Sequence, residues 1–245
     1  MNIQYQEFDG ANVVVVGGNQ GVGPAIVQAF LAQGAKVSVG LTSGAELANA
    51  PNSNAILIPA DLSSMDSAKA FLDVCEESSG QLAVLIVVPP PVKTQSVMDI
   101  AETQIRQILE SELAQPVFCL IEAARRMGQY GKGRIISFVS MSGKAGVHKN
   151  VAPYAAAKGG LIMFSRVLAA EIAGTGVTVN AVATSLFDVQ IAATPEAAHE
   201  IAKGIPVGRV GRSDEAAHAA LYLASGKSGY VTGETLNLSG GRFMD

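Results

Sequence analysis

Two residues in one stretch of the sequence have the types and the spacing for acid–base chemistry. Tyr154 and Lys158 stand four positions apart in the apolar, periodic segment 153–172, and side chains four residues apart share one face of a helix. An adjacent ammonium favours the phenolate, and bringing a tyrosine pKa from about 10 to about 7 takes roughly 4 kcal/mol. The pair predicts a tyrosine that donates or accepts a proton. The same spacing also fits an ordinary amphipathic pair with a lysine that extends to solvent.

A glycine-rich segment follows the first apolar run. Gly17, Gly21 and Gly23 have the spacing G-x-x-x-G-x-G and precede the helical pattern 25–33. Such glycines allow a tight turn and let a pyrophosphate approach the amides at the start of a helix. Pro24 suits the first helical turn, where its missing donor costs nothing. The segment therefore predicts a dinucleotide-binding loop, and the alternative is a glycine turn that serves packing alone.

Residues for the adenosine half of a dinucleotide are less specific. The second apolar run ends in 40–43 without the carboxylate that selects NAD. The hydroxyls of Thr42 and Ser43 suit a ribose phosphate, so we expect NAD(P) with a slight preference for NADP. Asp61 follows the third run and either accepts a hydrogen bond from adenine or caps the helix that begins near Ser64.

The apolar pattern supplies a scaffold for these residues. Short Val- and Ile-rich runs alternate with helix-length segments, which is typical of βαβ units and of a mainly parallel sheet covered on both faces. The expected strands are Asn12–Val16, Ala35–Val39, Ala55–Pro59, Leu82–Val88, Arg134–Val139, Val177–Val182 and Thr235–Leu238. Ligands bind beyond the carboxyl ends of such strands. No repeat or long linker divides the chain, so residues 1–245 are expected to form a single α/β domain.

Composition excludes several functions. The net charge is −4 without long blocks of like charge, and 49% of residues are hydrophobic, so a folded protein that does not bind nucleic acid is expected. No apolar run reaches about 18 residues and the first residues do not resemble a signal peptide, which favours a cytoplasmic protein with no membrane contact. Cys75 and Cys119 are expected to be buried free thiols. The histidines His148, His199 and His218 lack metal-ligand spacing, so no metal is expected.

Taken in order, the glycine loop, Asp61, the run 133–140 and the Tyr154/Lys158 helix resemble the short-chain dehydrogenase/reductase family over essentially the whole chain. The segments 154–161, 177–182, 205–209, 230–234 and 240–241 also look like the family's pattern. The resemblance implies a Rossmann-type doubly wound domain with a mainly parallel seven-stranded sheet.

The resemblance also implies roles for individual residues. Gly17, Gly21 and Gly23 would hold the pyrophosphate and Asp61 the adenine. Tyr154 would be the general acid/base, and Lys158 would bind the nicotinamide ribose and lower the tyrosine pKa.

The family places a serine after its fifth strand to hold the substrate oxygen. Ser140 stands fourteen residues before Tyr154 and Ser142 twelve, where the family usually has thirteen. We prefer Ser140, because the strand fixes its position more firmly than a loop does. The implied catalytic set is Ser140, Tyr154 and Lys158.

Four departures from the family affect the expected cofactor site, and the mildest is Val16 in place of the threonine before the first glycine. The family's Asn-Asn-Ala-Gly is replaced by a segment that ends in Pro89 and Pro90, and prolines remove N–H donors. The helix asparagine that holds a proton-relay water aligns with Leu113. The Pro-Gly after the sixth strand is Thr184-Ser185, and the threonine that would meet the nicotinamide amide aligns with Val189.

Two functions remain open. The first is an NAD(P)-dependent oxidoreductase of a secondary alcohol and ketone, with a 3-hydroxyacyl/3-oxoacyl thioester as the default small-molecule substrate under the segment 186–212. The second is a catalytically impaired subunit that pairs with an active paralogue. The family implies homo- or hetero-tetramers that use the helices around 100–127 and 154–172. A halohydrin dehalogenase-like lyase is disfavoured, because that group lacks the dinucleotide loop and replaces the lysine by arginine.

Overall fold

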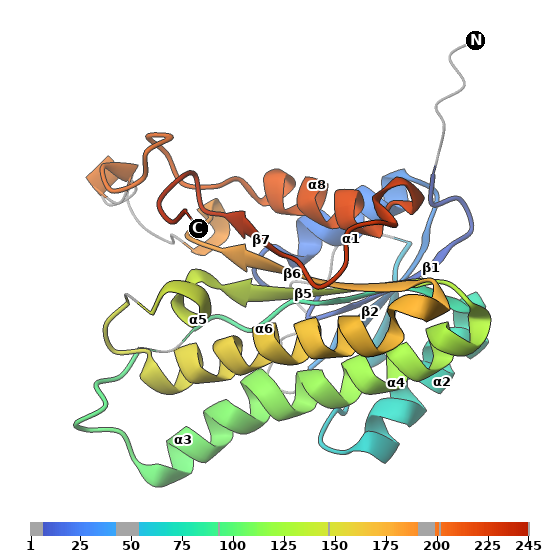
Figure 1. Ribbon diagram of the computed structural model, residues 1–245, viewed down its shortest axis with the longest axis horizontal. Helices are drawn as coiled ribbons and strands as arrows, with labels where there is room; N and C mark the ends of the chain where they lie inside the picture. The colour runs from blue at the N-terminus through green and yellow to red at the C-terminus, as the bar shows by residue number, and fades with distance from the viewer. Residues whose placement is uncertain are drawn as a thin grey trace.

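Seven parallel strands form the centre of the protein (Figure 1). The computed structural model describes residues 7–42, 54–92, 94–146, 148–190, 199–200 and 202–244. The strands are β1 (Asn12–Val16), β2 (Lys36–Leu41), β3 (Ile56–Pro59), β4 (Leu82–Val87), β5 (Gly133–Ser140), β6 (Val177–Thr184) and β7 (Thr235–Leu238). Their order is β3-β2-β1-β4-β5-β6-β7, and every neighbouring pair is parallel. The predicted doubly wound α/β fold is confirmed.

Helices cover both faces of the sheet. Helices α1 (Gly23–Ala32) and α8 (Ser213–Ala224) lie on one face, and α2 (Met65–Ser79), α4 (Gln115–Tyr130) and α6 (Ala152–Ile172) lie on the other (Figure 1). Alternate residues of β1 enter the two cores: Val13 and Val15 pack toward α1, whereas Val14 and Val16 pack toward α2 and α4. This explains the continuous apolar runs, because a strand buried on both faces needs no polar positions.

Shorter helical segments connect the main elements. They are α3 (Glu102–Leu109), a π-helical turn η2 (Glu110–Ala114), α5 (Met141–Ala145) and the 3₁₀ turns η3 (Ala173–Thr175), η4 (Asp188–Gln190) and η5 (Gly226–Ser228). The π-turn joins α3 directly to α4. It places one extra residue in the helical path, which becomes important at the site.

The glycine loop connects β1 to α1 at the carboxyl edge of the sheet. Gly17 has φ +72° and donates its N–H to the Gly40 carbonyl at 2.8 Å. A Cβ atom on Gly17 would collide with the Val88 carbonyl oxygen, which follows β4. Because β1 lies between β2 and β4, the loop stands at the switch point where ligands bind in such sheets.

Expectations about thiols, metals and membranes can be compared with the described residues. Cys75 and Cys119 are both free and buried, as predicted. No group of three His, Cys, Asp or Glu side chains in the described ranges could hold a metal ion. Among the helices described, none is long and apolar enough to cross a membrane.

Candidate active site

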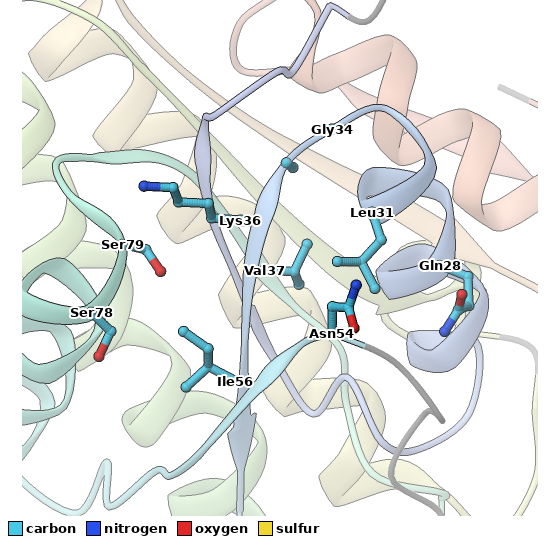
Figure 2. A pocket seen from close by; sticks show the side chains of 10 residues that line it. Gln28, Leu31, Gly34, Lys36, Val37, Asn54, Ile56, Ser78 and Ser79 are labelled. Atoms are coloured by element: carbon cyan, nitrogen blue, oxygen red, sulfur yellow. The ribbon is translucent and has the colours of Figure 1, made fainter.

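A cavity of about 520 Å³ opens at the carboxyl edge of the sheet. Its wall includes the glycine loop at Gly21, the segment after β4 from Val88 to Val92, Ser140 at the end of β5, Tyr154 of α6 and Thr184 at the end of β6. A second depression, of about 600 Å³, lies at the amino ends of β2 and β3 (Figure 2). It contains Lys36, Ser78 and Ser79 but none of the predicted site residues. The first cavity is therefore the candidate active site.

Tyr154 and Ser140 meet in the wall of this cavity. Tyr154 lies in the first turn of α6 and is buried. Ser140 lines the same cavity, its side chain lowers the pKa of the Tyr154 phenol, and its Oγ accepts the Ser142 N–H at 3.1 Å. The structure thus brings the preferred serine to the tyrosine at the surface of the cavity.

Lys158 lies deeper in the molecule, one helical turn from Tyr154. Its Nζ is 5.6 Å from the centroid of the Tyr154 ring, only 1% of the residue is exposed, and it does not line the cavity. Its Nζ lies 2.8 Å from Glu112 Oε2 and donates to the Glu112 backbone carbonyl at 3.3 Å. Glu112 is itself buried. The lysine is therefore held in an ion pair inside the protein.

This arrangement changes the charge that Tyr154 meets. Burial raises the pKa of Tyr154, the Glu112 carboxylate raises it further, and the hydrogen bond with Ser140 opposes both. Burial lowers the pKa of Lys158, while Glu112 opposes that shift. The sequence led us to expect a lowered tyrosine pKa. The direction found here is the opposite, because the phenol is desolvated and faces a carboxylate as well as an ammonium.

A second polar pair lies in the cavity wall. Ser142 Oγ is 2.7 Å from His148 Nδ1, and the imidazole meets the ring of Phe243 edge to face, with centroids 5.6 Å apart. Burial lowers the pKa of His148, and the charge of Arg242 lowers it further. The ring is therefore neutral at neutral pH. Sequence reasoning had treated His148 only as a histidine without metal-ligand spacing.

The glycine loop has an open backbone and unpartnered polar atoms, which fit a dinucleotide. Gly21 has φ +52° and a Cβ atom there would meet nothing within 4 Å, so the backbone surface is open beside the cavity. Asn19 Oδ1 and Gln20 Nε2 are buried polar atoms without a partner in the described part of the chain. Open backbone and unpaired polar atoms at the start of a helix suit the pyrophosphate of a dinucleotide.

The adenosine end is described only in part. Asp61 is exposed and its Oδ1 accepts the Ser63 N–H at 2.9 Å. Ser64, not Asp61, caps α2. Of the two hydroxyls considered at the end of β2, that of Ser43 lies outside the described residues.

Comparison of the sequence with known proteins identifies the family of this chain. Residues 16–242 match the family described as Enoyl-(Acyl carrier protein) reductase. The chain belongs to the short-chain dehydrogenase/reductase family. It is 33% identical over 243 residues to 3-oxoacyl-[acyl-carrier-protein] reductase FabG of Escherichia coli (strain K12), covering 97% of this chain and 99% of the relative. It is 32% identical over 237 residues to Nodulation protein G of Azospirillum brasilense, covering 93% and 96%.

One expected departure from the short-chain dehydrogenase/reductase pattern has a different form in the structure. The sequence alignment placed Leu113 where the family has its helix asparagine. Leu113 instead packs against α6 at Gly160. Its Cδ2 is so close that a Cβ atom on Gly160 would lie only 3.2 Å from it. The residue that faces Lys158 is Glu112. The π-turn Glu110–Ala114 adds one residue to the helix, so counting along a regular α-helix misplaces the position by one.

The residues of the departures after β4 and from the end of β6 onward lie at the cavity. Pro89, Pro90 and Pro91 line the cavity beside the glycine loop, and Val189 lines it while remaining 51% exposed. Thr184 Oγ1 donates to the Val139 carbonyl at 2.9 Å, so it serves the end of the sheet. The cavity therefore has an apolar wall after β4.

The described residues directly after β6 line the cavity. Phe187 is 2% exposed and lines the cavity. Asp188 accepts the Ser213 N–H at 3.2 Å, and Arg209 binds Glu215 through two contacts of 2.6 and 2.8 Å. These contacts fix both ends of the region that was expected to cover the substrate. Ile191 within it lies outside the described residues.

Proposed function

We propose that this protein is an NAD(P)-dependent oxidoreductase that interconverts a secondary alcohol and a ketone. The observation that carries the proposal is the position of Tyr154: its phenol meets Ser140 in a cavity that the glycine loop also lines. A proton donor, a polar anchor for a carbonyl oxygen and a dinucleotide loop thus share one site. The 3-oxoacyl reductase relatives support the same reaction class.

The residues of the loop would hold the cofactor. Gly17 and Gly23 shape the turn, and Gly21 leaves the backbone open to a pyrophosphate. Asp61 would reach the adenine, and Thr42 without a neighbouring carboxylate gives the slight preference for NADP. The bound nicotinamide would supply or accept the hydride.

The protein's own side chains would orient the substrate and move its proton. Ser140 would hold the substrate oxygen, while Tyr154 would give its proton to that oxygen during reduction. Pro89, Pro90 and Phe187 provide an apolar surface, and the names of the relatives favour a 3-oxoacyl thioester. Ser142 and His148 add a polar pair at the same wall.

Cofactor binding is the first test. NADH and NADPH are titrated into the purified protein while nicotinamide fluorescence is followed, and the absence of tryptophan keeps the excitation free of overlap. We expect saturable binding with NADPH at least as tight as NADH, followed by consumption of NADPH when acetoacetyl-coenzyme A is added. A folded protein that binds neither nucleotide would contradict the proposal.

A second candidate, a non-catalytic subunit that pairs with an active paralogue, is favoured by one observation. Lys158 is held by Glu112 and does not line the cavity, so it is not placed to contact a nicotinamide ribose. In that case the family's tetramer contacts would bring this chain to an active subunit. Turnover of NADPH and a 3-oxoacyl thioester by the isolated chain would exclude this function.

A further inference from the structure

We propose that Glu112 is a positioning residue that keeps the site in its proton-donating form. By pairing with the Lys158 ammonium it leaves Tyr154 as a neutral phenol, so the site is set to protonate a ketone and not to deprotonate an alcohol. The inference rests on the proposed function, and it adds the direction in which the site is prepared to work.

The geometry leaves little freedom to this pair. Glu112 and Lys158 are both buried, and the ammonium contacts both the carboxylate at 2.8 Å and the backbone carbonyl of the same residue at 3.3 Å. Two contacts from one residue fix the lysine toward the π-turn and away from the cavity. Removing one partner of a buried ion pair is strongly unfavourable, so the pair is expected to persist when ligands enter.

The charges of Lys158 and Glu112 together determine whether Tyr154 ionises. A lone ammonium beside Tyr154 would stabilise the phenolate, whereas an ammonium paired with a carboxylate has no net charge. The phenol then keeps its proton, in agreement with the raised pKa of Tyr154. In a protein interior such effects are screened less than at a surface.

Other charged groups near α6 do not replace Glu112 in its effect on the ionisation of Tyr154. Lys144 of α5 donates to the Thr235 carbonyl and to Asn237, and Glu110 on the π-turn is exposed. Among the described residues, further charged or titratable groups around the cavity and on α3, α4 and α6 are His148, Lys149, Arg242, Arg166, Glu171, Glu102, Arg106, Glu122, Arg125 and Arg126. Glu102 pairs with Arg106 within α3, and Glu122 pairs with Arg125 and Arg126 within α4. Arg126 also pairs with Asp73 and Glu76 of α2. Arg166 and Glu171 are exposed on α6, and His148, Lys149 and Arg242 face solvent or Phe243.

The proton balance of the step follows. During reduction the Tyr154 O–H bond would break and its proton would bond to the substrate oxygen, while the C=O π bond opens; a bound nicotinamide would supply the hydride that the carbonyl carbon needs. The phenolate that remains is reprotonated by water that enters the cavity. In the reverse direction Tyr154 has to lose its proton before it can act, and Glu112 opposes that loss.

Tyrosinate absorbance tests the inference without a substrate. The chain has five tyrosines and no tryptophan, so the difference between each protein and its Tyr154→Phe version reports Tyr154 alone. We expect no ionisation of Tyr154 below about pH 10 in the native protein. In Glu112→Gln the ionisation of Tyr154 should occur about 1–3 pH units lower, because the carboxylate whose charge raises the pKa of Tyr154 is removed. The matched control is Glu110→Gln, an exposed carboxylate on the same turn, which should behave as the native protein does.

An unchanged Tyr154 titration in Glu112→Gln would overturn the inference. If circular dichroism shows that Glu112→Gln is unfolded, Glu112→Asn serves as the second variant under the same criterion. The activity readout is the pH profile of alcohol oxidation, whose rise should move to lower pH by the same interval. Absence of any turnover would contradict the proposed function but leave the absorbance result intact, so the two failures are distinguishable.

Discussion

Pro116 stands four residues after Glu112, at the position whose N–H would donate to the Glu112 carbonyl in a regular α-helix. Proline has no such donor, and the helix widens here: Gln115 donates to Glu110, five residues earlier. Lys158 Nζ donates to the Glu112 carbonyl at 3.3 Å. The proline, the π-turn and the buried lysine thus form one arrangement, in which a side chain uses an acceptor that the proline leaves available.

Loss of the lysine should destabilise the protein strongly. In Lys158→Met the buried Glu112 carboxyl group has no cation, and breaking a buried ion pair costs about 3–5 kcal/mol. Urea unfolding at neutral pH measures the effect. The matched surface variant Lys69→Met removes the exposed pair with Asp73, and it should cost no more than about 1 kcal/mol.

The same variant should respond to pH. An unpaired buried carboxyl group takes up a proton readily, so the deficit of Lys158→Met should shrink as the pH falls toward about 4 and grow as it rises. Adding Glu112→Leu should recover part of the lost stability, because an apolar pair replaces a buried charge. A double variant no more stable than Lys158→Met would show that the ion pair is not the cause.

Removal of the phenol hydroxyl should abolish proton transfer without unfolding the protein. We expect Tyr154→Phe to reduce the rate of ketone reduction by about 10²–10⁴-fold, the usual contribution of a general acid. NADPH binding, followed by fluorescence, should persist because the glycine loop is unchanged. If Tyr154→Phe kept its full rate, another group would have to supply the proton.

The pH profile of reduction should extend far into the alkaline range. Burial and Glu112 raise the pKa of Tyr154, so the phenol stays protonated when the pH passes the ordinary tyrosine value near 10. The reduction rate of the native enzyme should therefore show no decline from loss of this proton between neutral pH and about pH 10. The expectation would be contradicted if the reduction rate of the native enzyme fell near neutral pH and this fall were absent in Glu112→Gln.

Three glycine variants separate folding from cofactor binding. Gly10, Gly17 and Gly21 all have positive φ, but a Cβ atom would collide with Val88 only at Gly17. Gly10→Ala gives the conformational strain alone, about 1–2 kcal/mol. Gly17→Ala should lose more stability than Gly10→Ala, by thermal unfolding. Gly21→Ala should match Gly10→Ala in stability. It should bind NADPH at least tenfold more weakly than the native protein does, which corresponds to about 1.4 kcal/mol. Unchanged affinity would mean that Gly21 does not face the pyrophosphate.

The outer face of α6 should control assembly. Met163 and Val167 stand one turn apart on this helix and are 56% and 51% exposed, which is typical of a surface that another chain covers. We expect the native protein to be larger than its 25.2 kDa chain by light scattering. Met163→Glu/Val167→Glu should reduce the size, whereas Met98→Glu on a loop should not. A native monomer would contradict a tetramer built on α6.

Much of the fold is predictable because burial on both faces leaves a strong apolar signal. Val13 to Val16 have no polar position, and β1 was predicted at its exact bounds. The ends of β5 and β6 were predicted short, since Ser140 and Thr184 are polar. These two residues pair with one another in the sheet, a relationship that hydropathy does not report.

The site was less predictable, for a local reason. Spacing located Ser140 and Tyr154, which need only a strand end and a helix start. It did not locate Glu112, because counting along the helix assumed a regular α-helical register. Pro116 four residues later was the available signal. The contact of His148 with Ser142 depends on how a loop closes, and spacing carries no information about that.

The parallel pairing of β1 with β4 also affects how the chain folds. Val16 pairs with Val87, far along the sequence, and the collision that excludes a side chain at Gly17 comes from the following residue. Parallel neighbours need crossover connections, and contacts between distant segments form slowly. The glycine loop therefore gains its fixed shape only after β4 has docked beside β1, so the shape proposed to receive a dinucleotide depends on a contact between distant segments.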